Sequence, residues 1–132
     1  MSSPLIDRLS QQFGYPVLDA TTLDAFLAQD GASVLFFSED PASYPEANDV
    51  AVILPELMSR FAGRARAAVI ARSAEKALQP RFGFLQWPAL VVCDHRRCLG
   101  TIARVRDWGE YLEEFERLLP APHRRIALTE IT

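Results

Sequence analysis

The hydrophobic residues of the chain follow two spacings, one typical of buried strands and one typical of helices. Apolar runs of strand length, rich in β-forming residues, occur at SVLFF (33–37), RAAVIA (66–71) and PALVVC (88–93). Helical spacing occurs in PLIDRLSQQF (4–13), LDAFLAQ (23–29), VAVILPELMSRFAG (50–63), AEKALQPRFG (74–83) and WGEYLEEFERLL (108–119). Because helices and strands alternate, the pattern predicts an α/β protein with helix-linked parallel strands.

The ends of these elements carry recognisable signals. We expect Thr22 and Ser73 to cap helices, and Asp107 with Glu110 to form a capping box at the start of the last helix. Pro16 holds YPVLD (15–19) in an extended conformation. The segments PALVVC and LGTIARV (99–105) flank the polar turn DHRR, which predicts an antiparallel hairpin.

We therefore expect one domain over residues 1–132, with a core at about 16–119 and a C-terminal tail over 120–132. Its predicted architecture is a central mixed β-sheet with helices on both faces. Half of the chain is hydrophobic (49%), but no apolar run reaches about 18 residues, so no membrane insertion is expected. The N-terminus lacks an apolar signal core, and two cysteines are too few for a disulfide framework, so we expect a cytoplasmic protein.

Charge is unevenly distributed along the chain. Residues 1–59 contain nine acidic side chains and one arginine, whereas residues 60–106 contain ten basic and two acidic side chains. Either the fold presents a segregated charge to partners, or it mixes these segments on its surface so that the fields cancel. The basic residues lie on different elements with few aromatic residues between them, and the pI is about 5.4, so nucleic acid is not an expected partner.

Three local matches resemble the thioredoxin fold. SVLFF, the loop SEDPASYPEAND (38–49) and the proline-containing VAVILPEL follow in the order of the central strand, active-site loop and kinked helix of a thioredoxin. The stretch PRFGFLQWPALVV (80–92) resembles the segment that carries the cis-proline, which places a cis peptide bond at Trp87-Pro88. If Pro55 is the kink proline, residues 47–50 occupy the CxxC positions.

Those positions contain no cysteine, so thiol–disulfide exchange at this loop is ruled out. We expect Asp49 there to act as an N-cap or a first-turn acid. Cys93 and Cys98 leave an alternative open, because they bracket the predicted hairpin turn and could form a disulfide in a thiol redox or peroxidase-type enzyme. With His95 they would supply only three ligands, so neither a metal site nor a cofactor is predicted.

The combination resembles a narrower family, the hydrogenase-expression accessory proteins HyaE, HupG and HoxO. The matching features are the N-terminal helix, the acidic proline-containing loop, WPALVV, and the hairpin followed by RDW and an acidic last helix. This resemblance implies a non-catalytic cytoplasmic chaperone of [NiFe] hydrogenase maturation. Its implied partners are the hydrogenase small subunit with its twin-arginine signal peptide, and other hydrogenase accessory proteins. A structural thioredoxin-like subunit of another assembly is a further alternative.

A twin-arginine signal peptide is basic at one end and apolar in its middle. The hypothesis is that acidic residues bind the arginines, that an apolar group contacts the middle, and that the backbone before the cis-proline pairs with extended peptide. The predicted peptide-binding residues are Glu39, Asp40, Glu46, Asp49, Glu56, Phe84, Leu85, Trp87 and Pro88. The competing interpretation is that the acids are ordinary solvated residues and that Trp87 packs over the rim of the core.

Overall fold

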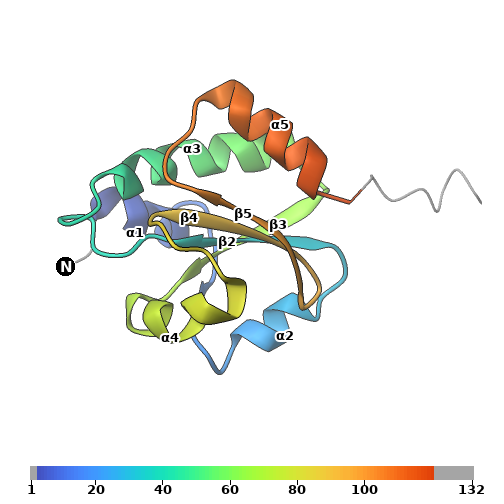
Figure 1. Cartoon of the computed structure of the whole chain (residues 1–132), viewed down its shortest axis with the longest axis horizontal. Coiled ribbons are helices and arrows are strands. Elements are labelled where there is room, and N and C mark those ends of the chain that lie inside the picture. Colours follow the sequence, from blue (N-terminus) through green and yellow to red (C-terminus); the bar gives the residue numbers. More distant parts are fainter. Residues whose placement is uncertain (1–2, 121–132) are drawn as a thin grey trace, which may run out of the picture.

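In a computed structural model of the chain, five strands form one sheet between two layers of helices (Figure 1). The structure describes residues 3–120. The helices are α1 (Pro4–Gln11), α2 (Leu23–Leu27), α3 (Glu46–Arg60), α4 (Arg72–Phe82) and α5 (Trp108–Leu118). The strands are β1 (Val17–Leu18), β2 (Ala32–Phe37), β3 (Ala65–Ile70), β4 (Ala89–Asp94) and β5 (Arg97–Ala103). This order of elements agrees with the hydrophobic pattern of the sequence.

The sheet has the strand order β1-β3-β2-β4-β5. Strands β1, β3 and β2 are parallel, whereas β4 pairs antiparallel with both β2 and β5. All six residues of the central strand β2 are buried, as expected for a strand that is covered on both faces. The Trp87-Pro88 peptide bond that precedes β4 is cis. The fold is therefore α/β and thioredoxin-like with a mixed sheet, as the sequence predicted.

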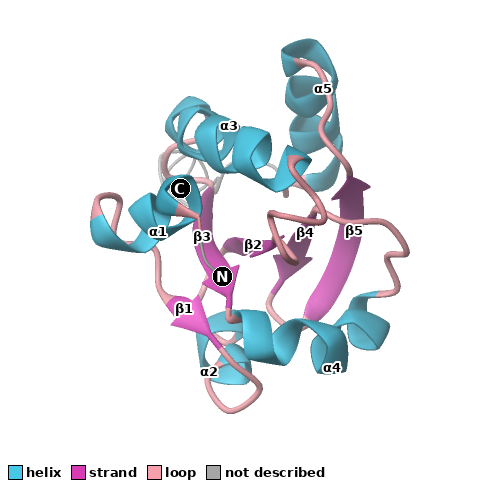
Figure 2. Cartoon of the chain, turned by 90° about the vertical axis from the view of Figure 1, so that its left-hand side faces the viewer, coloured by secondary structure: helices cyan, strands magenta, loops and turns pink. Residues whose placement is uncertain are grey.

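Each face of the sheet has its own hydrophobic cluster. Residues of α1, α3 and α5, among them Leu9, Leu54 and Phe115, pack on one face. Residues of α2 and α4, among them Leu27 and Leu78, pack on the other face. Figure 2 shows these two helical layers on opposite sides of the strands. The predicted arrangement of helices on both faces is thus confirmed.

Two predicted helix starts are wrong, each for a local reason. Helix α3 begins at Glu46 rather than Val50, because Pro45 has a helical φ of −60° and opens the helix instead of ending the loop. Helix α4 begins at Arg72, so Ser73 lies inside its first turn and is not the cap. Thr22 is the N-cap residue of α2, as predicted, but its side chain makes no capping bond, because its hydroxyl bonds with Asp19 instead.

The hairpin is tighter than predicted, since Asp94 pairs with Arg97 and leaves a two-residue turn at His95 and Arg96. His95 takes the positive φ of 54° that such a turn requires. The capping box is confirmed, because the Glu110 amide donates to the Asp107 carboxylate at 2.8 Å. No helix within residues 3–120 has the length and apolar content needed to cross a bilayer. Residues 121–132 of the predicted tail lie outside the described part of the chain.

Candidate functional site

A hollow of about 390 Å³ opens at the end of the sheet where α3 and β4 begin. Three segments that are distant in sequence supply its lining, namely residues 43–46, residues 85–87 and Arg104. We call it the Trp87 hollow. Of the predicted site residues, it brings together Glu46, Leu85 and Trp87. The hollow thus combines aromatic and aliphatic side chains with one carboxylate.

The residues between α4 and β4 present two large apolar side chains at this hollow. Gly83 ends α4 in the left-handed conformation, with a φ of 76°, and lets the chain turn back toward the sheet. Leu85 then projects outward and is 87% exposed, the most exposed large hydrophobic residue in the described chain. An exposed leucine beside a half-buried tryptophan gives this turn the character of a contact surface.

Phe84 lies underneath this turn rather than on it. Its ring packs edge-on against Phe37 and Trp87, with both pairs of ring centroids 4.8 Å apart, and only 3% of the residue is exposed. The prediction that Phe84 contacts a peptide directly does not fit this burial. Phe84 instead holds the indole of Trp87 in position. Pro88 is also buried, and its carbonyl accepts the amide of Arg104 at 2.7 Å.

The acidic member of the hollow is already engaged within the chain. The Arg104 guanidinium donates to both carboxylate oxygens of Glu46, with Nε 3.0 Å from Oε1, and the Val105 amide donates to Oε1 at 3.0 Å. These bonds to Arg104 and Val105 lower the pKa of Glu46 to about 2. The same carboxylate raises the pKa of Arg104. Glu46 is therefore ionised at neutral pH and held in one orientation.

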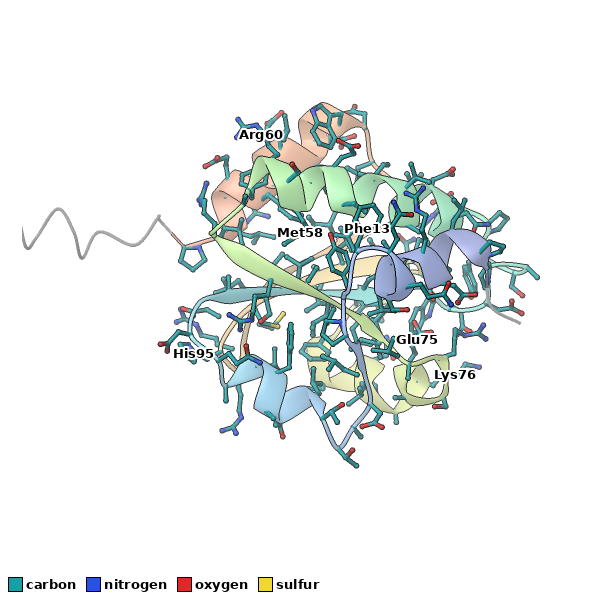
Figure 3. The ribbon with its side chains drawn as sticks, turned by 180° about the vertical axis from the view of Figure 1, so that it is seen from behind. Phe13, Met58, Arg60, Glu75, Lys76 and His95 are labelled. Atoms are coloured by element: carbon teal, nitrogen blue, oxygen red, sulfur yellow. The ribbon has the colours of Figure 1, made fainter. Side chains whose placement is uncertain are left out.

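Glu39 and Asp40 belong to a different cluster at the start of α4. Arg72 lies 3.5 Å from Glu39 and 3.9 Å from Asp40, and it also contacts Glu75 at 3.4 Å. The buried Glu75 carboxylate accepts the Glu39 amide, at 2.9 and 3.1 Å to its two oxygens. Figure 3 shows Glu75 turned inward from α4, while Lys76 points outward. Neither Glu39 nor Asp40 lines the Trp87 hollow.

Burial is the main cause that raises the pKa of Glu75 to about 7, and the charge of Glu39 adds to it. The hydrogen bond from the Glu39 amide and the positive charge of Arg72 act in the opposite direction. Glu75 thus fixes the start of the loop between β2 and α3, the loop that ends at the hollow.

Asp49 and Glu56 lie further along α3 and are both exposed. Asp49 is a first-turn acid, which is one of the two roles predicted for it. Glu56 follows Glu46 by ten residues, a rise of about 15 Å along a helix. Neither residue lines the Trp87 hollow, so the five predicted acids do not form one continuous patch.

The two cysteines sit opposite each other on β4 and β5 as free thiols, Cys93 buried and Cys98 exposed. Burial, and to a lesser degree the neighbouring Cys98, raises the pKa of Cys93 to about 12. Burial also raises the pKa of Cys98. Redox-active cysteines have lowered pKa values, so this pair lacks the activation that the enzyme alternative needs. Within residues 3–120, no three metal-ligating side chains gather into a metal site.

The uneven charge of the sequence largely cancels in the fold. Basic residues of the middle segment pair with acids of the first segment, as in Arg104 with Glu46 and Arg72 with Glu39. Arg81 and Arg96 both approach Asp24, and His95 approaches Asp30. Mixing, rather than segregation, is the better description of the surface.

Among the lining residues of the Trp87 hollow that sequence reasoning missed are Arg104 and Tyr44. Arg104 was placed only within a basic stretch. The predicted hairpin sets Ala103 opposite Pro88, whereas a register shift between Val92 and Cys93 brings Arg104 to that position. Tyr44, which is 37% exposed, is the one aromatic residue of the loop between β2 and α3. An exposed aromatic residue in a short acidic loop was the available signal.

Comparison with known proteins identifies relatives over most of the chain. The family model described as "Hydrogenase-1 expression protein HyaE" matches residues 5–111. The hydrogenase expression/formation protein HoxO of Azotobacter vinelandii is 51% identical over 119 residues, covering 90% of this chain and 80% of that protein. HupG of Rhizobium leguminosarum bv. viciae, described in the same words, is 45% identical over 123 residues, covering 90% and 83%.

A crystal structure also matches. The hydrogenase expression/formation protein HupG of Rhodopseudomonas palustris CGA009 superimposes with a TM-score of 0.58 at 42% identity. The match covers 78% of this chain and 93% of that one. The similarity therefore extends from sequence to fold.

Proposed function

Because the chain belongs to the HyaE family of hydrogenase expression proteins and so has a role in hydrogenase maturation, we propose that it is a non-catalytic chaperone. Its proposed client is the [NiFe] hydrogenase small subunit, bound in the cytoplasm through its twin-arginine signal peptide before export. Other hydrogenase accessory proteins are proposed as further partners.

The observation that carries this proposal is the Trp87 hollow. An extended peptide segment needs apolar contact for its side chains and hydrogen-bonding groups for its backbone. Leu85 and Trp87 supply the apolar contact, and the backbone before the cis Pro88 supplies a segment for strand pairing. The volume of about 390 Å³ is large enough for a few side chains of the apolar middle of a signal peptide.

The charge at the hollow is largely balanced within the chain. Glu46 is paired with Arg104, and Glu39 and Asp40 lie beside Arg72 outside the hollow, so the apolar contacts and not the acids support the proposal. The apolar middle of a signal peptide supplies the matching side chains for Leu85 and Trp87. We include Tyr44, Glu46, Leu85, Trp87 and Pro88 in the proposed site, with Phe84 supporting Trp87.

A titration tests the proposal. A labelled synthetic peptide, with two adjacent arginines followed by an apolar stretch, is titrated with the full chain, with Trp87→Ala and with Trp108→Ala. Trp108 is 44% exposed and does not line the hollow, so it is a control for loss of an indole outside the proposed site. We expect Trp87→Ala to weaken binding by about tenfold or more, as for a central aromatic contact, and Trp108→Ala to have little effect. Equal affinity of all three proteins would contradict the proposal.

A further inference from the structure

The outer side of β5 and the adjacent face of α5 form a second hollow, of about 250 Å³. Its lining includes Thr101 and Ile102 of β5 and Glu110, Glu113 and Glu114 of α5. Arg106, from the segment that joins these two elements, lines it as well. We call it the β5–α5 groove. It is distinct from the Trp87 hollow and contains none of the predicted site residues.

Strand β5 is an edge of the sheet, so part of its backbone has no strand partner. The Arg104 amide bonds to the Pro88 carbonyl, and Ala103 is paired with Ala89. Because hydrogen-bonded and non-bonded pairs alternate in antiparallel strands, the backbone groups of Thr101 and Ala103 face the open edge. Ala103 shows this directly, since its carbonyl accepts the Arg106 Nε–H at 2.9 Å.

Arg106, a residue of the chain itself, shows which contacts the groove offers to a guanidinium group. The Arg106 guanidinium bonds to the edge carbonyl of Ala103 and reaches 4.0 Å from the Glu110 carboxylate. Glu114 is held by Arg117 at 2.7 Å. Glu113 has no ion pair or hydrogen bond within the described residues and is exposed at the groove. The outward backbone groups of Thr101 and the carboxylate of Glu113 are therefore available to a cationic peptide.

We propose that this groove binds the paired arginines of an extended peptide that adds to the edge of β5. The proposal rests on the proposed function, because the same peptide would place its apolar stretch in the Trp87 hollow. The two hollows flank one segment, since Arg104 lines the first and Arg106 the second, and residues two apart are separated by at most about 7 Å. An extended peptide advances about 3.3 Å per residue, so a short stretch spans both hollows.

The charge of the groove also selects against another occupant. A second copy of this chain, paired edge to edge through β5, would bring the carboxylates of two α5 helices together. Like charges at an interface disfavour that pairing, whereas a cationic peptide is attracted. We therefore assign the groove to a basic peptide and not to a self-pairing edge.

Two substitutions probe the groove in the full chain. Glu113→Lys reverses the free charge without breaking any ion pair of the described chain. Thr101→Pro removes the outward amide of the edge strand together with the threonine side chain, at an edge position where proline is tolerated. Asp30→Lys, at an exposed position outside both hollows and outside the predicted peptide-binding residues, is the charge-reversal control. The probes are the twin-arginine peptide and the same peptide with both arginines replaced by glutamine.

We expect Glu113→Lys to weaken binding of the arginine peptide by about tenfold and to leave binding of the glutamine peptide unaffected. Asp30→Lys should change the affinity for neither peptide. Thr101→Pro should weaken binding of both peptides, and hydrogen exchange of the Thr101 amide should slow when the wild-type protein is saturated with peptide.

If Trp87→Ala weakens binding while Glu113→Lys and Thr101→Pro bind like wild type, the groove is not the arginine site. This inference then fails, and the proposed function stands. If the wild-type protein binds neither peptide, the proposed function fails and this inference with it. The inference would also be overturned if the wild-type protein forms dimers and Thr101→Pro abolishes them without changing the peptide affinity.

Discussion

Arg104 and Glu46, which are 58 residues apart in sequence, are joined by two hydrogen bonds at the edge of the Trp87 hollow. This ion pair links the end of β5 to the start of α3, which are the two elements that flank the hollow. Arg104 adopts a φ of 65°, which is uncommon for a residue other than glycine. The contact therefore fixes both the shape of the site and its charge.

Removal of this pair should change the response of the protein to acid. The pKa of Glu46 is lowered to about 2 from 4.5, so its contribution to the free energy of unfolding is complete above about pH 4.5. That contribution is lost as the pH falls through about 2. We expect Arg104→Ala to lower the free energy of unfolding at pH 7 only slightly, since both side chains are partly exposed. Alanine carries a Cβ atom as arginine does, so the substitution leaves the backbone strain at this positive φ unchanged.

Urea denaturation of wild type, Arg104→Ala and Glu46→Gln between pH 7 and pH 2.5 measures this effect. The two single variants and the double variant give the coupling energy of the pair at each pH. The coupling should shrink as the solution becomes more acidic. A coupling energy that is the same at pH 7 and pH 2.5 would contradict the assignment.

Glu75 should produce the opposite pH dependence. Its pKa is raised to about 7 in the folded state, so the folded protein takes up this proton at a higher pH than the unfolded chain does. The stability that Glu75 contributes is therefore complete below about pH 4.5 and is lost as the pH rises through about 7. We expect this residue alone to make the protein more stable at pH 5 than at pH 8, by about 1–3 kcal/mol.

Glu75→Gln is the variant that isolates this effect, because glutamine keeps the shape of the side chain and cannot ionise. The difference in free energy of unfolding between wild type and Glu75→Gln should change between pH 5 and pH 8. A constant difference across this range would show that the carboxyl of Glu75 is already ionised throughout it.

Phe84 and Leu85 are neighbours in sequence with opposite environments, and their substitutions should separate stability from binding. Phe84→Ala removes a buried ring that contacts Phe37 and Trp87, so we expect a loss of about 3–5 kcal/mol in the free energy of unfolding. Leu85→Ala removes an 87% exposed side chain and should change that free energy by less than about 0.5 kcal/mol.

Leu85→Ala should nevertheless weaken binding of the apolar part of the signal peptide. Chemical denaturation and peptide titration of the two variants measure both quantities. A destabilisation by Leu85→Ala comparable to that of Phe84→Ala would mean that Leu85 is packed in the folded protein.

The elements of this fold could be predicted from sequence because their signals are local. The apolar run at 33–37 identified the central strand, and Asp107 with Glu110 identified the start of α5. The cis bond before Pro88 followed from the resemblance of its neighbours to a known segment. Each of these features depends on residues that are close together in the chain.

The site could be predicted only in part, because it depends on contacts between distant residues. The partner of Glu46 lies 58 residues away, and the buried Glu75 meets the Glu39 amide across 36 residues. The composition of the loop showed that it is acidic, but not that Arg72 and Arg104 already neutralise much of its negative charge. The burial of Phe84 beneath Trp87 likewise depends on Phe37, a residue of another strand.

The two thiols should behave as structural cysteines. In the folded protein, Cys98 is exposed as a residue, but its thiol is partly desolvated, which raises its pKa above the usual 9.0, so it should react with iodoacetamide slowly at neutral pH. Cys93 is completely buried and should react only after unfolding. Intact-mass analysis at pH 7 and pH 9, with and without denaturant, distinguishes one modified thiol from two, and Cys98→Ser identifies which one reacts first. Rapid alkylation of Cys98 at pH 6–7, together with turnover in an insulin-reduction assay, would instead support a thiol enzyme and remove the basis for a non-catalytic role.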